Sequence, residues 1–296
     1  MEQPAGQNES LNPLYKEKVH VAFLGWEIER IVRPILEMRG NRLILICFPQ
    51  DKEGAWDYLV EIKQQLEAKS IKVEVIKEDL YNLVDLLAIL NKVLQIEKLR
   101  KNDIFINVSA GTKITACAST IAAMSTPNIT AYYVSMKKYY PKDNPAFREK
   151  NRLETLTTEF QGTTTIPFWQ IAIPEQKYIK TLHTIKQRIK NDNDKIFIKD
   201  LIDILKVENV INVKYNKERR KETSSEYMAI KPIIEKLEAW EYITVSPRKR
   251  NKYLQLTEKG KNAIRMYLSY ELEMADLKEN DGLSIDQWIT KLKKRE

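Results

Sequence analysis

A short loop of small and hydroxylated residues, with one lysine, follows a strand-like apolar run in the first half of the chain. The run covers residues 103–106, and the loop reads Ser109-Ala110-Gly111-Thr112-Lys113. A glycine lets the backbone approach a ligand closely, and the amides at a helix N-terminus attract phosphate, as does a lysine. The same residues also suit a tight turn with a solvated lysine, so the spacing alone leaves both interpretations open.

A second loop follows the first strand-like run, residues 19–24. In this loop Trp26 could stack on a base and Arg30 could reach a phosphate. The alternative is that Trp26 packs on the sheet and Arg30 pairs with a nearby glutamate. The loop at 109–113 is not a P-loop, which requires the order Gly-Lys-Ser/Thr, or a dinucleotide fingerprint, which places three glycines after the first strand.

Strand-like and helix-like segments alternate between residues 19 and 134. Strands are expected at 19–24, 43–48, 72–76, 103–108 and 129–134, with helices at 27–39, 55–68, 83–99 and 114–124. This alternation predicts an α/β domain, a Rossmann-like parallel sheet with helices on both faces. Both loops would then lie at the carboxyl edge of the sheet, where open α/β sheets bind ligands.

The second half of the chain follows a different pattern. After an irregular, polar stretch at 136–165, helices are expected at 175–190, 199–206, about 223–239 and 261–270, with strands at 242–245 and 252–256. Two strands joined by a basic turn after three helices predict a winged helix-turn-helix. The expected divisions are a loose tail (1–17), the Rossmann-like domain (18–165), a linker (166–174), the winged helix (175–270) and a charged extension (271–296) that includes a short helix near 285–292.

The positive charge is concentrated in the second half. Residues 1–174 hold 22 Lys and Arg against 21 Asp and Glu, whereas residues 175–296 hold 27 against 20, so +1 and +7 add to the net charge of +8. Such asymmetry indicates that one half meets a polyanion and the other does something else.

Basic residues gather at the two places where a winged helix meets DNA. The residues expected to contact DNA are Arg219, Arg220, Lys221, Ser224, Ser225, Tyr227, Met228, Lys231, Arg248, Lys249, Arg250 and Lys252. The alternative is that these are solvated loops in a lysine-rich chain. On the helix that carries Ser224 to Lys231, the buried stripe is predicted to be Ile230, Ile233, Ile234 and Leu237.

Several classes of protein are disfavoured by composition. No segment has the roughly 18–20 apolar residues of a membrane helix, and the N-terminus lacks an apolar signal core, so a cytoplasmic protein, nucleoid-associated when on DNA, is expected. Cys47 and Cys117 fall in predicted core segments and are interpreted as small buried residues rather than as a disulfide or metal site. The two histidines, His20 and His183, are far apart in sequence, which disfavours a histidine-based metal site.

The motifs Leu-Gly-Trp-Glu-x-x-Arg at 24–30 and Asn-Val-Ser-Ala-Gly-Thr-Lys at 107–113 resemble the two ligand loops of the CRISPR-associated Rossmann fold, or CARF, family. The resemblance is greatest to archaeal regulators that join a CARF domain to a C-terminal winged helix, and it covers most of residues 19–270. The family commonly has Gly where this chain has Ala110. The resemblance implies a homodimer that binds a cyclic oligoadenylate at its two-fold axis, with a pocket formed by Gly25, Trp26, Arg30, Asn107, Ser109, Ala110, Gly111, Thr112 and Lys113.

The function expected from these features is a ligand-responsive transcriptional regulator that binds double-stranded DNA, with neither cofactor nor metal and no enzymatic activity. A CARF ring nuclease is an alternative, although the Arg-x₄₋₆-His pattern of CARF-linked ribonucleases is absent from the sequence. A second alternative is a DNA-binding protein whose α/β domain serves only for dimerisation. The sequence does not identify the ring size of the ligand, the operator, the direction of regulation or a link to a CRISPR system.

Overall fold

A six-stranded sheet forms the centre of the first domain. This computed structural model describes residues 16–52, 54–139, 157–189, 195–212, 222–247, 252–272, 274–280 and 282–294. The strand order is β3-β2-β1-β4-β5-β6. The strands are β1 Lys18–Phe23, β2 Arg42–Cys47, β3 Lys72–Lys77, β4 Asp103–Asn107, β5 Ile129–Tyr139 and β6 Thr157–Thr165. All neighbouring pairs from β3 to β5 are parallel, which confirms the Rossmann-like sheet expected from the alternating pattern.

The sixth strand was not expected from the sequence. Irregular structure was predicted for residues 136–165, and this is wrong for the described parts of that range. β5 continues to Tyr139, and β6 pairs with it in the antiparallel direction at the edge of the sheet. β6 reads TTEFQGTTT, so its strand propensity lies in β-branched threonines rather than in an apolar run. The register shifts between Ser135 and Met136, as a β-bulge would cause.

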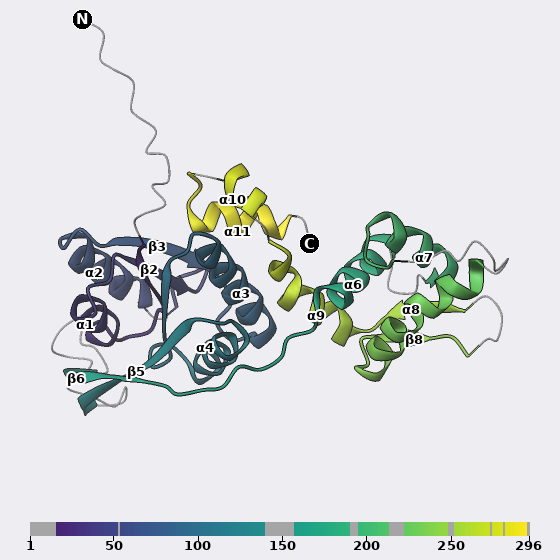
Figure 1. Ribbon diagram of the computed structural model, residues 1–296. Helices are drawn as coiled ribbons and strands as arrows, with labels where there is room; N and C mark the ends of the chain where they lie inside the picture. Colours follow the sequence, from purple (N-terminus) through teal and green to yellow (C-terminus); the bar gives the residue numbers. More distant parts are fainter. Residues whose placement is uncertain are drawn as a thin grey trace, which may run out of the picture.

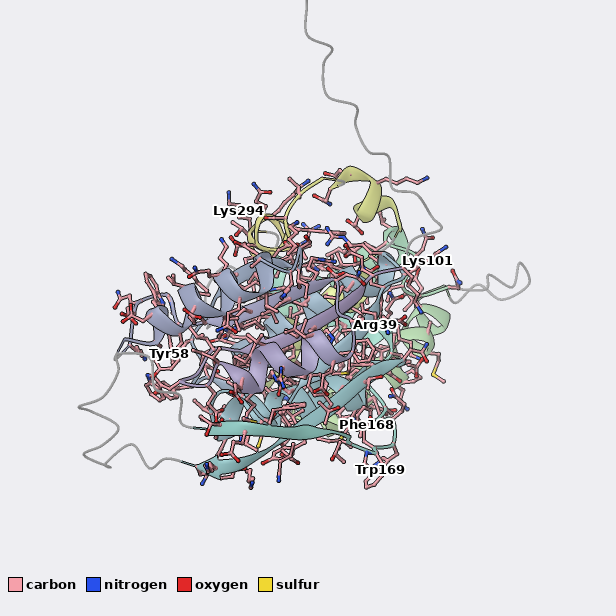
Figure 2. All side chains as sticks on the ribbon, turned by 90° about the vertical axis from the view of Figure 1, so that its left-hand side faces the viewer. Arg39, Tyr58, Lys101, Phe168, Trp169 and Lys294 are labelled. Carbon is pink, nitrogen blue, oxygen red and sulfur yellow. The ribbon has the colours of Figure 1, made fainter. Side chains whose placement is uncertain are left out.

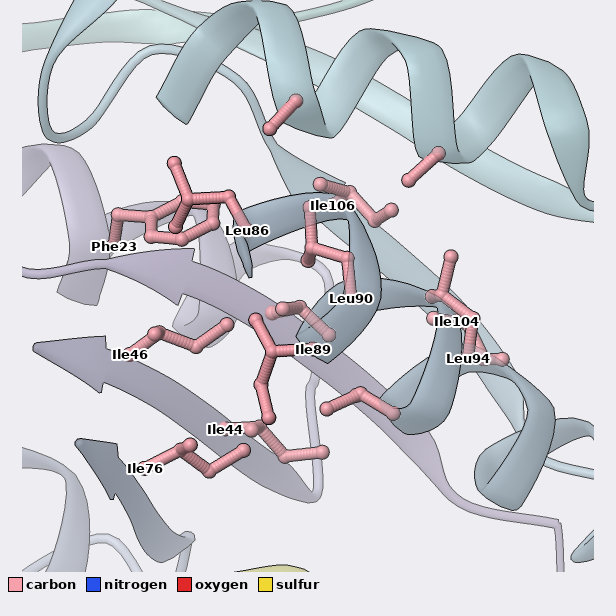
Figure 3. Packing of buried hydrophobic residues seen from close by; sticks show 14 of the residues in the cluster. Phe23, Ile44, Ile46, Ile76, Leu86, Ile89, Leu90, Leu94, Ile104 and Ile106 are labelled. Carbon is pink, nitrogen blue, oxygen red and sulfur yellow. The ribbon is translucent and has the colours of Figure 1, made fainter. Parts of the chain in front are cut away.

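Helices cover both faces of the sheet (Figure 1). α1 (Glu29–Glu37) and α2 (Ala55–Glu67) pack on one face, and α3 (Leu83–Leu99) and α4 (Lys113–Ser125) pack on the other. Figure 3 shows the core beneath α3, where leucine and isoleucine side chains of the helix lie against apolar side chains of the strands. Every residue of β2 is buried, as a central strand covered on both faces requires.

The two cysteines differ in their surroundings. Cys47 is buried in β2, and its burial raises the pKa of the thiol to about 11. Cys117, which was expected in the core, is exposed, so that expectation is wrong. α4 turns Thr115, Ala118 and Ala122 towards the protein, and helical periodicity places residue 117 on the outer face.

The second domain has the element order of a winged helix. The elements are α6 Gln176–Arg188, β7 Ile196–Phe197, α7 Ile198–Val207, α8 Glu222–Ala239, β8 Ile243–Val245, β9 Tyr253–Leu256 and α9 Glu258–Tyr267. The three strands form an antiparallel sheet in the order β7-β9-β8. This domain has its own apolar core, to which α8 contributes the predicted stripe of Ile230, Ile233, Ile234 and Leu237. Pro232 lies within α8, which runs on to Ala239.

The chain returns to the first domain after the winged helix. α9 is followed by η1 (Leu268–Glu271), α10 (Met274–Glu279) and α11 (Ile285–Lys293), which confirms the helix predicted near 285–292. Figure 1 shows α11, in yellow, close to α3 and β3, and the two helices are in contact. α11 adds four buried side chains to the cluster beneath α3, namely Ile285, Trp288, Ile289 and Leu292. The end of the chain therefore completes the core of the first domain.

Buried charges fasten α11 to the sheet. Arg42, at the start of β2, pairs with Glu97 at 2.6 Å and with Glu74 at 3.0 Å. The Ile285 amide, at the N-terminus of α11, donates a 2.8 Å hydrogen bond to Glu74 Oε2. Burial alone would raise the pKa of Glu74, but the Ile285 amide and the Arg42 charge together lower it below its ordinary value. Arg100 adds a hydrogen bond of 3.2 Å to the carbonyl of Leu283.

Two polar contacts join α9 to α3. Asn91 Nδ2 donates to the carbonyl of Met266 at 2.7 Å, and Arg265 pairs with Asp85 in the first turn of α3. On the other side, the amide of Ile171 in the linker donates to the carbonyl of Met124 in α4 at 3.0 Å. The winged helix is therefore joined to the first domain both by the linker and by the segment that follows it.

Candidate functional site

The two loops singled out in the sequence meet at the carboxyl edge of the sheet. β1 and β4 are neighbouring parallel strands, and the helices that follow them lie on opposite faces. Such a topological switch point is where open α/β sheets bind ligands. A Cβ placed on Gly25 would lie 3.4 Å from the amide nitrogen of Gly111, so the two backbones are close together.

Gly111 shapes the second loop. Its φ of +89° lies in the left-handed region, and an added Cβ would lie 2.6 Å from Thr115 Oγ1 and 2.8 Å from the Cβ of Phe23. Only glycine fits this position without strain. Thr112 then caps α4, because its side chain accepts a hydrogen bond from the Thr115 amide at 3.2 Å. Lys113 begins the helix with an exposed side chain, so positive charge and a helix N-terminus lie together at the surface.

Asn107 lies under this loop and faces inward. The residue is fully buried; its Oδ1 accepts from the Ser109 amide at 3.0 Å and from the Ser109 hydroxyl at 2.6 Å. Its Nδ2 donates to the carbonyl of Arg30 at 2.9 Å. Ser109 Oγ in turn accepts from the Val134 amide at 3.1 Å. Asn107 and the Ser109 hydroxyl are thus committed to holding the two loops and β5 together.

Arg30 is buried between the loops, with 7% of its surface exposed. One end of its guanidinium donates to the carbonyl of Ser109 at 2.9 Å and lies 3.4 Å from Glu27 Oε1. The other end donates to the hydroxyl of Tyr139 at 3.4 Å, and Nε is buried without a hydrogen-bond partner among the described residues. Burial raises the pKa of Glu27, although Arg30 and a hydrogen bond from Thr157 oppose that shift.

A buried aromatic pair supports the site from below. His20 Nδ1 lies 3.0 Å from the Tyr132 hydroxyl, and its ring stacks on Phe105 at 5.0 Å between centroids. Tyr132 also has a hydrogen bond to Asn107, and its burial raises the pKa of its phenol. Burial, helped by Lys18, lowers the pKa of His20 to about 4. A chain of contacts therefore runs from His20 through Tyr132 to Asn107, which holds the two loops together.

The structure brings the nine predicted ligand residues into one neighbourhood but gives them different surroundings. Gly111, Thr112 and Lys113 are exposed or partly exposed, whereas Ala110 is buried and Trp26 is partly buried against the apolar cluster on the α1 and α2 face. The pairing of Arg30 with a nearby glutamate, given as an alternative from the sequence, is found with Glu27, whereas Tyr133 and Tyr139 were not expected as neighbours of Arg30. Tyr133 lay within the strand expected at 129–134, but its contact with α1 has no local signal, and Tyr139 lay beyond the expected end of that strand.

The candidate nucleic-acid interface lies on α8. Tyr227 and Met228 are exposed, and Lys231 follows one turn later with an exposed side chain that lies 3.6 Å from Glu235. Lys206 of α7 pairs with Glu226 at 2.5 Å and thereby joins the two helices of the helix-turn-helix. Lys252 lies directly before β9 and is partly buried.

The remaining predicted DNA contacts lie outside what the structure describes. Arg219, Arg220, Lys221, Arg248, Lys249 and Arg250 are beyond the described residues, and the side chains of Ser224 and Ser225 are not described. For these residues the contact with DNA stays a prediction.

Two family models match separate parts of the chain. Residues 18–139 match the model described as "HFX_2341_N:-like, N-terminal", and residues 177–267 match the "DUF6293 C-terminal winged helix domain". The matches fall on the two domains of the structure. The chain therefore combines a Rossmann-like domain, built on a mostly parallel six-stranded sheet, with a C-terminal winged helix.

One curated relative is the uncharacterized protein MJ1513 of Methanocaldococcus jannaschii. It is 28% identical over 158 residues, which cover 51% of this chain and 46% of the relative. The matched region thus spans about half the length of that protein.

Solved structures align with the chain at low identity and low TM-score. Protein VC1899 from Vibrio cholerae has a TM-score of 0.36 at 11% identity, with coverage of 88% of this chain and 68% of that one. Can2 from Sulfobacillus thermosulfidooxidans, in complex with cyclic tetra-adenylate, has a TM-score of 0.34 at 15% identity, covering 86% and 65%. Enterococcus italicus Csm6, bound to cyclic hexa-2'-fluoro-hexa-dAMP, has a TM-score of 0.34 at 14% identity, covering 76% and 55%. Scores of this size do not assign a ligand to this chain.

The described residues hold neither a metal-binding cluster nor a helix of membrane-spanning character. Among them, no group of three or more His, Cys, Asp or Glu side chains is arranged to hold a metal ion. No helix in this part of the chain combines the length and the apolar character that crossing a bilayer demands.

Proposed function

We propose that the protein is a ligand-responsive, DNA-binding regulator whose first domain binds a cyclic oligoadenylate-type nucleotide. The ligand would bind at the 107–113 loop of two subunits of a homodimer, and the paired winged helices would bind double-stranded DNA. The sequence resemblance to CARF–winged-helix regulators supports the proposal, and so does the match of a winged-helix model to residues 177–267.

The observation that carries the ligand half is the meeting of Gly25 and Gly111 at the switch point, beside the exposed Lys113. An anion bound there would contact both the backbone at the two glycines, which carry no side chain, and the N-terminus of a helix. Because Asn107 and Arg30 are engaged internally, they would hold the loops while Lys113 contacts the phosphate.

Calorimetric titration of the native protein with cyclic tetra-adenylate and cyclic hexa-adenylate tests this half. The K113A variant should bind roughly 10- to 100-fold more weakly, since a hydrogen bond to a charged group contributes about 1.5–3 kcal/mol. K69A is the matched control, because Lys69 is an exposed lysine just before β3, at the opposite edge of the sheet. Absence of binding by the native protein to either ring would refute the ligand half.

The DNA half is supported by the exposed Tyr227, Met228 and Lys231 on α8 and by the charge of +7 on residues 175–296. In a selection from random duplexes, Y227A and K231A should change the preferred sequence. Lys236, on another face of α8 over the ring of Trp240 at 5.2 Å, provides the control K236A, which should leave the preference unchanged.

The basic turn between β8 and β9 provides a separate test. Replacing Arg248, Lys249 and Arg250 together by alanine should flatten the dependence of log affinity on log salt by about one unit per lost contact in each subunit. The loss of affinity should be similar on any duplex, because phosphate contacts position the protein on DNA without reading the base sequence. An unchanged salt slope would remove this turn from the interface and leave the ring-nuclease and dimerisation-module alternatives in place.

We assign no catalysis to the site. Glu27 is buried and already accepts from Thr157 and pairs with Arg30, so it is not free to act as a base. Incubation of the native protein with each cyclic oligoadenylate, followed by chromatography, should return the intact ring.

Homodimers are expected in sedimentation of the full chain at micromolar concentration, and a monomeric mass would contradict the two-fold site.

A further inference from the structure

Two exposed tyrosines of β5 lie over the buried arginine of the candidate site. Tyr133 is 41% exposed and Tyr139 is 60% exposed, whereas Tyr132 of the same strand is buried. Arg30 places its guanidinium carbon 6.0 Å from the centre of the Tyr133 ring and 5.7 Å from that of Tyr139. The two phenols also share a hydrogen bond, which is the main cause of the raised pKa of Tyr133.

This pair belongs to the ligand edge of the sheet. The Val134 amide, next to Tyr133, donates to Ser109 Oγ, so β5 is fastened directly to the 107–113 loop. Beyond that point β5 runs on to Tyr139, past the last residue of β4, and carries its side chains above the edge. The aromatic rings and Lys113 therefore flank the same loop.

The arrangement of Arg30 makes these rings suitable for stacking. Its contacts with Ser109 and Glu27 keep the guanidinium in place, so the rings above it have a fixed, positively charged support. Exposed aromatic rings on such a support are the kind of platform on which nucleic-acid bases stack. A surface cation–π cluster without a ligand is the alternative, and it would leave the rings without effect on binding.

We propose that Tyr133 and Tyr139 form a stacking platform for a purine base of the nucleotide whose phosphate lies at the 107–113 loop. The inference rests on the proposed function and adds to it the residues that contact the base. Phosphate recognition and base recognition would then come from different elements, α4 and β5, and would respond differently to salt.

The test is a calorimetric titration with cyclic tetra-adenylate and cyclic hexa-adenylate at several salt concentrations. Y139L and Y133L should each weaken binding of the ring that the native protein prefers by about tenfold, which corresponds to about 1.4 kcal/mol. Y139F should stay within about threefold of the native protein, since it keeps the ring. The salt slope should be unchanged in the leucine variants but reduced in K113A, because stacking releases no counterions.

Tyr81 provides the matched control. It is 56% exposed and follows β3 at the same edge, at the far end of the sheet from β5, so Y81L should bind as the native protein does. Binding by Y133L and Y139L at native strength would overturn the stacking platform and leave the proposed function intact. A reduced salt slope in these variants would also overturn it. No binding by the native protein would refute the proposed function itself, and the platform with it.

Discussion

Gly111 is the residue on which the shape of the candidate site depends most directly. G111A should destabilise the protein by roughly 2–4 kcal/mol, because about 1–2 kcal/mol of left-handed strain adds to overpacking against Thr115 and Phe23. Gly282 also has a positive φ, of +81°, but a Cβ there meets nothing within 4 Å. G282A should therefore lose only the stability that the left-handed backbone strain accounts for. Urea unfolding of the two variants measures the difference, and equal losses would contradict the crowding at Gly111.

His20 predicts how stability depends on pH. Its pKa in the folded protein is about 4, below the ordinary 6.5, so the unfolded chain binds the proton more readily. The stability that this histidine contributes is complete above pH 6.5 and is lost as pH falls towards 4, with a loss of roughly 2 kcal/mol at pH 5. Urea unfolding of H20N at pH 7 and pH 5 should show a smaller pH dependence than the native protein. H183Q is the control, and a native-like dependence in H20N would contradict the assignment.

At this scale the sequence predicted residue types better than orientations. Gly111 and Thr112 were expected at a strand-to-helix turn because their chemistry is local, and both are found there. The inward orientation of Asn107 depends on partners from α1 and β5, which lie far away in sequence. The burial of Arg30 depends on the Ser109 carbonyl and the β5 tyrosines, and no local pattern signals those contacts.

At the scale of elements, α11 is the segment whose role the sequence concealed. Its apolar residues predicted a short helix, but the segment was assigned only to a charged extension, with no packing partner named. Trp288 is instead fully buried, and its ring lies 5.6 Å from the guanidinium carbon of Arg100. A short amphipathic helix does not reveal which surface it covers, because that surface is made by residues that lie far earlier in the sequence, such as Glu74, 211 positions before Ile285.

The W288A variant should lower the free energy of unfolding of the first domain by roughly 3–5 kcal/mol, as expected for the loss of a large buried aromatic side chain. Trp169, labelled with Phe168 in Figure 2, lies on the linker and is 76% exposed. W169A should accordingly change stability by no more than about 0.5 kcal/mol. Thermal unfolding, monitored by circular dichroism, compares the stabilities of W288A, W169A and the native protein. Similar midpoints for W288A and the native protein would show that α11 is not docked in solution.

Strong periodicity made the other elements predictable. α3 was expected at 83–99 and spans Leu83–Leu99, since seventeen residues of helical pattern leave little ambiguity. β6 was missed because an edge strand needs few apolar residues, and its partner is the extension of β5 rather than a neighbour with its own signal. The same omission hid Tyr139, one of the two tyrosines proposed to stack on a base.

The whole molecule is a chain that leaves its first domain and comes back to it. The linker leads out along α4, and α9 and α11 return to α3, so α3 contacts both the sheet and the segment that ends the winged helix. α3 also packs beside α4, the helix that begins at Lys113. A change at the 107–113 loop therefore has a continuous path of packed elements to the winged helix, and an effect along it is measurable as a coupling between ligand and DNA affinities.

The same arrangement predicts that the first domain is incomplete when cut at the linker. A fragment of residues 16–174 lacks Ile285, Trp288, Ile289 and Leu292, and it leaves Glu74 without the amide that lowers its pKa. It should unfold at a lower temperature than the first domain does in the full chain. A synthetic peptide of residues 272–296, at about 100 times its dissociation constant, should restore roughly 2.7 kcal/mol, because it binds only the folded fragment. The same peptide with the W288A substitution should restore much less. A fragment that is as stable alone as in the full chain, and indifferent to the peptide, would show that the end of the chain is not part of the first domain.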